Sequence, residues 1–581
     1  MDKYFYNVED NILIILSLLK QFGIKKVIAS PGATNITLVA SMQQDSYFEM
    51  YSCVDERSAA YMACGLSEES GEPVVLTCTG ATASRNYMPG LTEAYYRKLP
   101  ILVITSSQDS NKIGHLFPQV TDRTQLPTDI VVASFQLPFV KDEDDKWSNI
   151  VKVNQAINDL RYNEGGPVHI NLITRYTRDY SVKELPSIKK IDKICNTSDM
   201  PRIESDSKIA IFISSHHFFN SEQIDAIDRF CSTHNAVVFC DSTSNYFGKY
   251  RVFSSLIFAQ ENTKKSTLEF DLLIHLGEMS GDYYTRLKII PKEVWRISKD
   301  GMFRDSFRKL TKLFCMDILD FFNYYKKGAS ENKLYPLYLS IYTDLYNNIP
   351  DLPFSDLWIA QTLSKMLPKN TVLHTGILNS LRCWNFFDCK NIVRSNSNVG
   401  GFGIDGCVSS LIGASFVHPK NIYLGVFGDL AFFYDINSLG NREFGNNIRI
   451  LLVNNGKGAE FRHYNNDGSQ FGEDTDKYIA AAGHNGNKSN LLVKHFSEDL
   501  GFKYLSASNK EDFLNVVNSF VVESSSKPII LEVFTDSINE SEALFLLRNI
   551  QRADASMVVK NTVRKTLGDS TISKLKNFLK K

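Results

Sequence analysis

Two oxygen-bearing side chains, Asp429 and Asn455, each follow an apolar segment that has the character of a strand. The first segment ends in Gly428-Asp429, and the second, residues 448–453, ends in Asn454-Asn455. Ligands of an open parallel sheet lie beyond the carboxyl ends of its strands, so these oxygens are expected side by side. Carboxylate and amide oxygens are ligands that Mg2+ prefers, often together with substrate phosphates. The alternative is a strand-end Asp and an ordinary Asn-Asn-Gly turn.

A second carboxylate, Glu56, lies between a predicted strand and a predicted helix. The strand covers residues 48–56 and ends at Asp55-Glu56, and the helix covers residues 57–69. The helix dipole favours a Glu in the first turn, so a surface position is one interpretation. A Glu that closes a buried strand would instead lie in a dry pocket, where its hydrogen bonds are strong. The residues alone leave both interpretations open.

A glycine-rich loop, GGFGIDG at residues 400–406, contains the spacing G-x-G-x-x-G. A dinucleotide-binding loop needs a preceding strand, and the short polar run at residues 395–399 does not supply a typical one. We interpret the loop as one that allows the backbone to approach an aromatic ligand closely. Ile404 then either contacts that ligand or belongs to the core.

Other polar candidates lie in predicted loops. Gln119 follows the strand at residues 100–106 and would face the same cleft as Glu56. His115, His374 and His463 lie near predicted strand ends, where a histidine can act as an acid or a base, although a lone histidine is more often structural.

Strands and helices that alternate with short connections position these residues. The alternation predicts an α/β fold with three doubly wound domains and mainly parallel sheets. We place the domains at residues 1–185, 186–345 and 346–538, followed by a helical C-terminal tail at 539–581. The middle domain resembles a Rossmann unit and has few convergent polar motifs.

Composition excludes several classes of protein. The 581 residues include 43% hydrophobic and 22% charged residues, and the formal net charge is −1, so we expect no nucleic-acid partner and no attraction to an anionic membrane. The ten cysteines include no C-x-x-C pair, which argues against a disulfide framework, a zinc site or an iron–sulfur cluster. The start lacks a signal sequence and no apolar run reaches transmembrane length, so a cytoplasmic enzyme is expected.

With these residues in view, the chain resembles the thiamine-diphosphate-dependent enzymes over nearly its full length. Within them it looks most like the succinyl-enolpyruvyl-hydroxycyclohexene-carboxylate synthases of the menaquinone pathway. The similar pieces are SPG at 30–32, DER at 55–57, GIDG at 403–406, and GDL with DINSL within 428–439. The resemblance implies a pyrimidine-binding domain, a central domain and a diphosphate-binding domain, with thiamine diphosphate and Mg2+ as cofactors.

The resemblance also implies site roles. Glu56 would activate the cofactor by a hydrogen bond to its pyrimidine ring, Gln119 would be the catalytic loop residue, and Ile404 would hold the bent cofactor. The metal ligands would be Asp429, Asn455 and the carbonyl of Lys457. Leu430 stands where family members usually have Gly. The implied cofactor-binding residues are Glu56, Gly403, Ile404, Gly428, Asp429, Leu430, Asn455, Lys457 and Gly458.

The departures from the family concern the substrate. The synthases resemble S-P-G-S-R-S after the first strand, and that Arg helps to bind isochorismate; here Thr34 stands in its place, with no cation nearby in the sequence. Val399 replaces a second Arg, and Val cannot bind a carboxylate. Arg382 approximates another family Arg but is slightly displaced. The candidate substrate residues are Ser30, Thr34, Asn35, Arg382, Val399 and His463.

We therefore expect an enzyme that decarboxylates a 2-oxo acid and transfers the resulting acyl-anion equivalent to an acceptor. The alternatives are a simple decarboxylase that releases an aldehyde, an acetolactate-synthase-like enzyme that also holds FAD, and a non-catalytic homologue. The resemblance implies a homodimer or homotetramer with active sites at the subunit interface.

Overall fold

The computed structural model describes residues 5–161, 165–328, 330–484 and 488–550 of the 581-residue chain. These residues form two compact units. Unit 1 consists of Met1–Asp199 and Lys299–Cys315, and unit 2 consists of Met200–Ser298 and Met316–Lys581.

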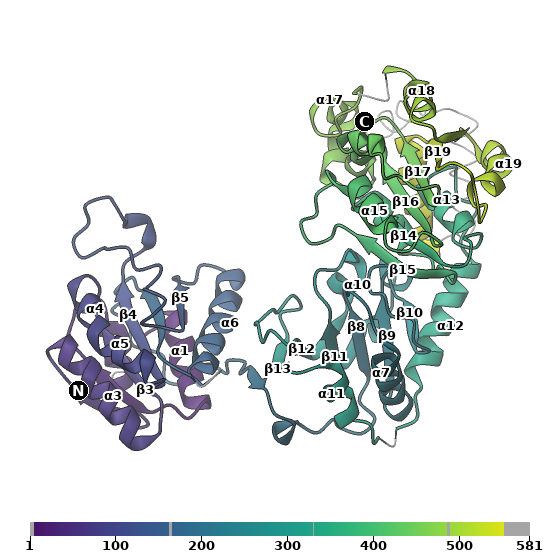
Figure 1. The fold of residues 1–581 in the computed structure, drawn as a ribbon. Coiled ribbons are helices and arrows are strands. Elements are labelled where there is room, and N and C mark those ends of the chain that lie inside the picture. Colours follow the sequence, from purple (N-terminus) through teal and green to yellow (C-terminus); the bar gives the residue numbers. More distant parts are fainter. Residues whose placement is uncertain (1–4, 162–164, 329, 485–487, 551–581) are drawn as a thin grey trace, which may run out of the picture. The chain divides into compact units, whose positions relative to one another are not determined.

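The first sheet, in unit 1, has six parallel strands in the order β2-β1-β3-β4-β6-β5 (Figure 1). The strands are β1 (Lys26–Ala29), β2 (Glu49–Ser52), β3 (Val74–Cys78), β4 (Ile101–Ser107), β5 (Ala133–Leu137) and β6 (Val168–Ile173). The helices of this unit are α1 (Asp10–Gln21), α2 (Ile36–Gln43), α3 (Glu56–Ser70), α4 (Thr82–Asn86), α5 (Met88–Tyr96) and α6 (Glu143–Asp159). Unit 1 also contains the parallel pair β7 (Asp192–Ile194) and β13 (Leu310–Phe314).

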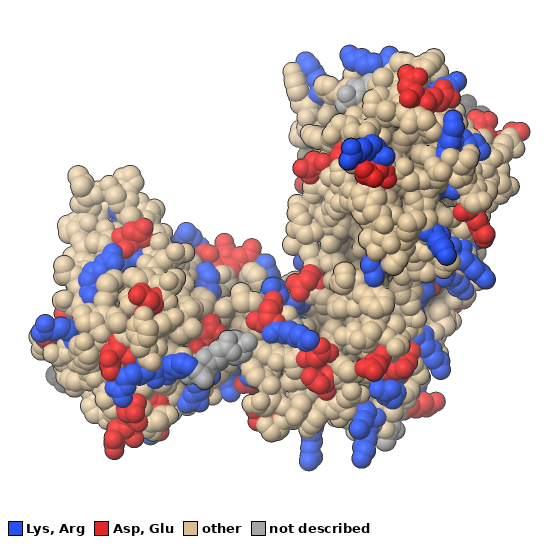
Figure 2. Space-filling model, viewed as in Figure 1, with Lys and Arg blue, Asp and Glu red and all other residues tan. Residues whose placement is uncertain are grey.

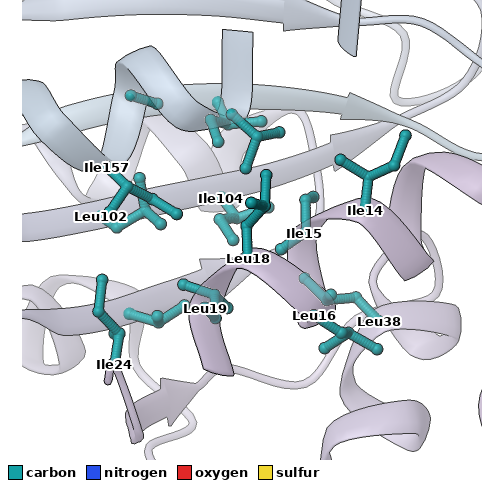
Figure 3. Packing of buried hydrophobic residues seen from close by; sticks show 14 of the residues in the cluster. Ile14, Ile15, Leu16, Leu18, Leu19, Ile24, Leu38, Leu102, Ile104 and Ile157 are labelled. Atoms are coloured by element: carbon teal, nitrogen blue, oxygen red, sulfur yellow. The ribbon is translucent and has the colours of Figure 1, made fainter. Parts of the chain in front are cut away.

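The alternation of side chains along β4 divides the core of unit 1 into two layers. Leu102 and Ile104 belong to a cluster with residues of α1 and α6, which Figure 3 shows from close by. Ile101 and Val103 belong to another cluster, with residues of α3 and α5. Successive strand residues point to opposite faces of a sheet, so β4 is covered by helices on both faces. This burial on both sides explains why β4 reads as a continuous apolar run.

The second sheet, in unit 2, contains parallel strands in the order β10-β9-β8-β11-β12. The strands are β8 (Ile209–Ile213), β9 (Ala236–Cys240), β10 (Arg251–Phe253), β11 (Glu269–Leu276) and β12 (Ile290–Ile297). The helices of this part are α7 (Ser221–Thr233), α8 (Ser255–Ala259), α9 (Lys265–Leu268), α10 (Tyr283–Lys288), α11 (Ile318–Tyr324) and α12 (Leu334–Asn347).

The third sheet, also in unit 2, has six parallel strands in the order β15-β14-β16-β17-β19-β18. The strands are β14 (Thr371–Thr375), β15 (Ile392–Ser397), β16 (Ile422–Gly428), β17 (Ile448–Asn454), β18 (Lys503–Ala507) and β19 (Ile529–Phe534). The helices are α13 (Asp356–Leu363), α14 (Asn379–Trp384), α15 (Cys407–Ser415), α16 (Asp429–Tyr434), α17 (Thr475–Tyr478), α18 (Leu492–Asp499), α19 (Lys510–Phe520) and α20 (Ser537–Arg548).

The first and third sheets share one topology. Numbered along the chain, the strands of both sheets have the spatial order 2-1-3-4-6-5. A strained residue also recurs in both: Ala81, before α4, has φ 56° and ψ −129°, and Leu378, before α14, has φ 65° and ψ −117°. A non-glycine residue pays a conformational cost at such angles, which cluster at functional sites. The chain therefore contains the same doubly wound arrangement twice.

The predicted α/β fold with three mainly parallel sheets is confirmed. The prediction that a strand continues to Glu56 is wrong, because β2 ends at Ser52 and α3 begins at Glu56. Asp55 causes this boundary, since its carboxylate accepts a hydrogen bond from the backbone N–H of Arg57 and caps the helix. The predicted domain boundaries remain predictions, and residues 551–581 of the predicted tail lie outside the described residues.

Figure 2 shows Lys and Arg side chains interspersed with Asp and Glu on the visible face of each unit. No broad region of this face carries charge of one sign. Among the described residues, no helix combines the length and apolar character needed to cross a membrane.

We predict that Ile104→Ala destabilises the first sheet. Ile104 is fully buried, and deletion of such a side chain costs about 2–5 kcal/mol through lost burial and the cavity left behind. Hydrogen exchange of β4, followed by mass spectrometry, should report a lower opening free energy in the variant. Leu116→Ala is the matched control because Leu116 is 98% exposed. Equal protection of β4 in both variants would contradict this account of the core.

Candidate active site

Asp429 lies where β16 gives way to α16, beside the end of β17. The register pairs Gly428 with Val453, so Asp429 comes level with the last residue of β17. Its Oδ2 accepts a hydrogen bond from the backbone N–H of Gly456 at 2.6 Å, and its Oδ1 accepts one from Leu430 at 2.8 Å. The predicted meeting of the two strand ends is therefore present in the third sheet.

The carboxyl group of Asp429 lies in an environment that disfavours its charge. It is 4% exposed, and burial raises its pKa to about 6 although backbone N–H groups favour the ionised form. A cation at the free side of the carboxylate would offset this penalty, because an opposite charge stabilises the ionised form. Asp429 is thus suited to hold either a proton or a metal ion.

The side chains of Asn454 and Asn455 have different hydrogen-bonding environments. The side chain of Asn454 donates a hydrogen bond to Glu532 Oε1 at 2.7 Å and is held within the sheet. The Oδ1 atom of Asn455 is buried and accepts no hydrogen bond from the residues that the structure describes. A buried acceptor without a donor is costly, so this oxygen is expected to meet a donor or a cation. Gly456, with φ 77°, turns the chain so that its N–H meets Asp429.

Lys457 offers its carbonyl oxygen next to this pair. The carbonyl accepts a hydrogen bond from Ala459 at 2.9 Å, which leaves its second lone pair for another ligand. The ammonium group is directed elsewhere, to Asp476 Oδ2 at 2.6 Å. Gly458 donates its backbone N–H to the carbonyl of Ala480 at 2.6 Å. One carboxylate, one amide oxygen and one carbonyl form a donor set that fits Mg2+.

The described part of the chain contains no group of three or more His, Cys, Asp or Glu residues that could hold a metal. The candidate metal site is therefore the mixed set of carboxylate, amide and carbonyl oxygens. Leu430, in the position of the expected Gly, is half-buried beside it. A side-chain carbon at Gly428 would meet no atom within 4 Å, so the approach to the strand end is open there.

The glycine-rich loop runs from the end of β15 to the start of α15. Val399 is buried, whereas side-chain carbons at Gly400 and Gly401 would meet open space. Ile404 is half-buried and packs against the core cluster that contains Cys407. Gly403 lies so close to Asp405 that an added side-chain carbon would come within 2.3 Å of its Oδ1. The loop thus combines an open backbone with one anchored apolar side chain.

Arg382 and His463 are both engaged with neighbouring residues. The guanidinium of Arg382 donates two hydrogen bonds to the carboxylate of Glu460, at 2.5 and 2.8 Å. His463 Nε2 lies 2.8 Å from Asn379 Oδ1, and burial, with the charge of Arg382, lowers its pKa to about 4. Neither residue offers a free charge to a substrate carboxylate in this arrangement.

In unit 1, Glu56 is the first residue of α3 and is half-buried. Burial is the main reason that the pKa of the Cys78 thiol is raised to about 12, and a hydrogen bond with Tyr87 lowers this pKa. The charge of Glu56 raises the pKa of the thiol further, and the charge of Arg123 lowers it. The carboxylate therefore lies close to the carboxyl end of β3. Asp55, next to it, is occupied by the backbone of Arg57 and the hydroxyl of Ser58.

The loop after β1 packs tightly onto the loop after β3. Ser30 donates its N–H to Thr77, and its carbonyl accepts from the side chain of Asn35 at 3.0 Å. Thr34 is buried, with its hydroxyl bonded to Thr79 and to the carbonyl of Ser106. The three predicted substrate residues of this loop are thus brought together.

The structure does not show a contact between Gln119 and Glu56. Gln119 is exposed, with φ 63°, on the loop that joins β4 to β5. The same loop carries Arg123, which sequence reasoning missed because nothing distinguishes it from a surface arginine. Arg123 is 1% exposed and its guanidinium covers Gly80, the residue after Thr79. Thr79 is in turn bonded to Thr34, so a cation from a distant part of the sequence lies one residue away from the contact of Thr34.

Comparison with known proteins adds to this geometry. Residues 13–126 match the family described as "Thiamine pyrophosphate enzyme, N-terminal TPP binding domain". The chain is 28% identical to the 2-succinyl-5-enolpyruvyl-6-hydroxy-3-cyclohexene-1-carboxylate synthase of Bacteroides thetaiotaomicron, over 93% of this chain and 98% of that protein. The synthase of the same name from Flavobacterium johnsoniae is also 28% identical, over 91% of this chain and 97% of that protein.

The matched domain coincides with the part of unit 1 that carries Glu56, Thr34 and Arg123. The similarity to the synthases extends through the strand ends that carry Asp429 and Asn455, because it covers more than nine-tenths of the chain. The predicted resemblance and the predicted thiamine diphosphate cofactor are confirmed. The chain is thus a thiamine-diphosphate-dependent enzyme, in which residues 13–126 match the N-terminal TPP-binding domain of such enzymes.

Proposed function

We propose that this enzyme uses thiamine diphosphate and Mg2+ to decarboxylate a 2-oxo acid and to transfer the acyl unit to an acceptor. The observation that supports this most directly is the buried, donor-free Oδ1 of Asn455 beside the buried carboxylate of Asp429. A hard cation satisfies both groups, and in such sites the cation is commonly shared with a phosphate group.

Each part of the machinery has a candidate residue. Thiamine diphosphate, when bound, supplies a nucleophilic carbon that accepts the 2-oxo acid and stabilises charge after loss of CO2. Asp429, Asn455 and the Lys457 carbonyl would hold the metal ion. Glu56 would hydrogen-bond the pyrimidine ring and favour the tautomer that removes the thiazolium proton. The further positions proposed to contact the cofactor are Gly403, Ile404, Gly428, Leu430 and Gly458.

The curated relatives carry the name of a carboxylate synthase, which supports carbon–carbon bond formation as the reaction type. We propose a different substrate pair, because the family arginines are replaced by Thr34 and Val399 in this chain. Arg382 is already paired with Glu460 in the described structure. Gln119, Ser30, Asn35 and His463 remain candidate residues of the substrate pocket.

A reducing compartment suits the chain. All ten cysteines are free, and seven of them are buried. Free thiols persist where glutathione and thioredoxin keep them reduced, so we propose a cytoplasmic location. Small molecules, and other copies of this chain, are the partners that this proposal requires.

A panel of 2-oxo acids, incubated with the holoenzyme and candidate acceptors, tests the proposal. Mass spectrometry should detect release of the carboxylate carbon of the donor as CO2 and a product that joins the remaining acyl unit to the acceptor. An aldehyde as the sole product would instead establish a simple decarboxylase. Bound FAD in the purified protein would favour the acetolactate-synthase-like alternative.

We predict that Asp429→Ala abolishes Mg2+-dependent binding of thiamine diphosphate, because the diphosphate loses its bridging cation. Calorimetry with cofactor, with and without Mg2+, measures the effect. Burial raises the pKa of Asp429 to about 6, so protons compete with the metal ion and wild-type Mg2+ affinity should fall as the pH drops below about 6.

Asp435→Asn is the matched control for the metal site. Asp435 is also buried, but its carboxylate accepts hydrogen bonds from the backbone and hydroxyl of Ser409. This variant should keep its Mg2+-dependent cofactor affinity if it folds. Unchanged affinity in Asp429→Ala would refute the assignment of the metal ligand.

We predict that Glu56→Gln still binds the cofactor but activates it slowly. The amide keeps the shape of the side chain and removes the charge that favours the reactive tautomer, so exchange of the thiazolium C2 proton should slow by orders of magnitude. Hydrogen–deuterium exchange at that carbon in bound cofactor is the measurement. Glu69→Gln, on the exposed face of α3, should exchange at the wild-type rate. Equal rates in Glu56→Gln and wild type would rule Glu56 out.

We predict that two inactive variants restore one another. If each site combines the Glu56 of one subunit with the Asp429 of another, a mixed dimer of Glu56→Gln and Asp429→Ala contains one site with both native residues. Mixing and reassembly should then recover up to about a quarter of wild-type activity, since half of the dimers are mixed and each has one intact site. A catalytically competent monomer in sedimentation analysis would refute this arrangement.

A further inference from the structure

Arg123 is a buried cation whose hydrogen-bonding groups are mostly unused. It is 1% exposed, and among the described residues its guanidinium makes one hydrogen bond, which Nη2 donates to Asn171 Oδ1 at 3.3 Å. The Nε and Nη1 atoms have no acceptor among the described residues. A guanidinium carries five N–H donors, and leaving buried donors unpaired is costly.

Arg449 shows how this chain satisfies a buried arginine that has a structural role. It is 2% exposed, and its guanidinium donates to four backbone carbonyls, those of Asn446, Ile448, Phe520 and Val522. Arg123 has no such cage. The contrast indicates that the acceptors of Arg123 come from outside the described chain.

The surroundings of Arg123 contain no compensating carboxylate within the part of unit 1 that the structure describes, since Arg123 forms no ion pair there. Its charged neighbour Arg85 carries the same sign, and burial lowers the pKa of Arg123. Arg85 donates to the backbone carbonyl of Asp122 and is exposed. The charge of Arg123 is therefore not neutralised by a described carboxylate, and an anion at this place would be stabilised.

The position of Arg123 connects it with the proposed reaction. Its Nη1 lies 2.2 Å from the place that a side-chain carbon of Gly80 would occupy, so only Gly allows this approach. The preceding residue, Thr79, is bonded to Thr34, which stands in the place of the family Arg. Both Glu56 and Arg123 influence the charge of the Cys78 thiol. The guanidinium therefore lies at the same strand ends as the proposed cofactor-activating Glu56.

We propose that Arg123 binds a substrate carboxylate that is retained during the reaction. The inference rests on the proposed function. A guanidinium held against the carboxylate that leaves as CO2 would stabilise its charge before bond cleavage and slow the reaction. The carboxylate held by Arg123 is thus the distal one of a dicarboxylic donor or one carried by the acceptor. Arg forms paired hydrogen bonds with such a group.

Access to the guanidinium requires movement of the loop that joins β4 to β5. The loop carries both Arg123 and Gln119, and it exposes the apolar residues Leu116 and Phe117. Opening of this loop would expose unpaired N–H groups to a carboxylate. Substrate binding would thereby couple to the position of Gln119, the proposed catalytic loop residue.

The donor arm of the test compares 2-oxoglutarate with 2-oxopentanoate, which has a methyl group in place of the distal carboxylate. In the wild type, kcat/KM should favour 2-oxoglutarate, and in Arg123→Gln this preference should fall by about tenfold or more, as expected for a lost charged hydrogen bond. Arg123→Lys should restore part of the preference. Arg85→Gln, which removes a neighbouring exposed charge, should change it less than about threefold.

The acceptor arm uses benzoate and its neutral analogue benzamide as unreactive probes. Calorimetry on the holoenzyme should show benzoate binding that weakens about tenfold or more in Arg123→Gln, and benzamide binding that does not change. If Arg123→Gln loses the preference in the donor arm alone, Arg123 binds a carboxylate of the donor. If it loses the preference in the acceptor arm alone, Arg123 binds a carboxylate of the acceptor. Wild-type preferences retained in both arms by folded Arg123→Gln, or absent from both arms in the wild type, overturn the proposal.

A second variant, Gly80→Ala, separates the role of the guanidinium from misfolding of Arg123→Gln. Gly80→Ala keeps the charge of Arg123 but places a methyl group where Nη1 now lies, so it should displace the guanidinium and reduce the same preferences. The rate of exchange of the thiazolium C2 proton in Arg123→Gln and in Gly80→Ala should match the rate in the wild type. Loss of that exchange in the wild type would refute the proposed function, whereas normal exchange with unchanged preferences would refute only the role of Arg123.

Discussion

The hydrogen bond between Asp429 Oδ2 and the backbone N–H of Gly456 joins two adjacent strand ends of the third sheet. Its formation requires the parallel register of β16 and β17 and the positive φ of Gly456. This bond fixes the turn that carries Asn455 and Lys457 on either side of Gly456, and Oδ1 of Asn455 is buried there without a donor among the described residues. The oxygen set that suits Mg2+ thus follows from strand pairing and one turn, and not from a cluster of charged residues.

Burial gives these groups their chemical character. Water would satisfy the amide oxygen of Asn455 and lower the pKa of Asp429 towards its usual value, and neither would then favour a cation strongly. The core that excludes this water consists of the apolar faces of α15, α16 and the central strands. Replacement of the usual Gly by Leu430 keeps that side of the site apolar and half-covered.

Much of this arrangement was predictable from sequence. Apolar strands that end in Gly-Asp and Asn-Asn predict both the sheet and the meeting of Asp429 with the turn after β17, because parallel strands end at one edge. The boundary at Glu56 was not predictable from apolar character, since the cap formed by Asp55 ends the extended segment. Arg123 was missed for a different reason. Its burial depends on a loop that folds over Gly80, and no local pattern records such a long-range contact.

The shared order of the first and third sheets lets their strand ends be compared position by position. In the third sheet, Asp429 follows the third strand, β16, and Asn455 follows the fourth strand, β17. The first sheet has Thr79 and Gln108 directly after its third and fourth strands, and Arg123 covers the residue next to Thr79. The third sheet therefore carries at this edge the oxygen atoms that we propose to bind a cation, whereas the first sheet carries Arg123, which we propose to bind an anion, near the carboxylate of Glu56. Equivalent strand ends of one topology thus present different charged groups, so the residues that follow the strands, and not the strand order, decide the sign of the ligand that each edge can attract.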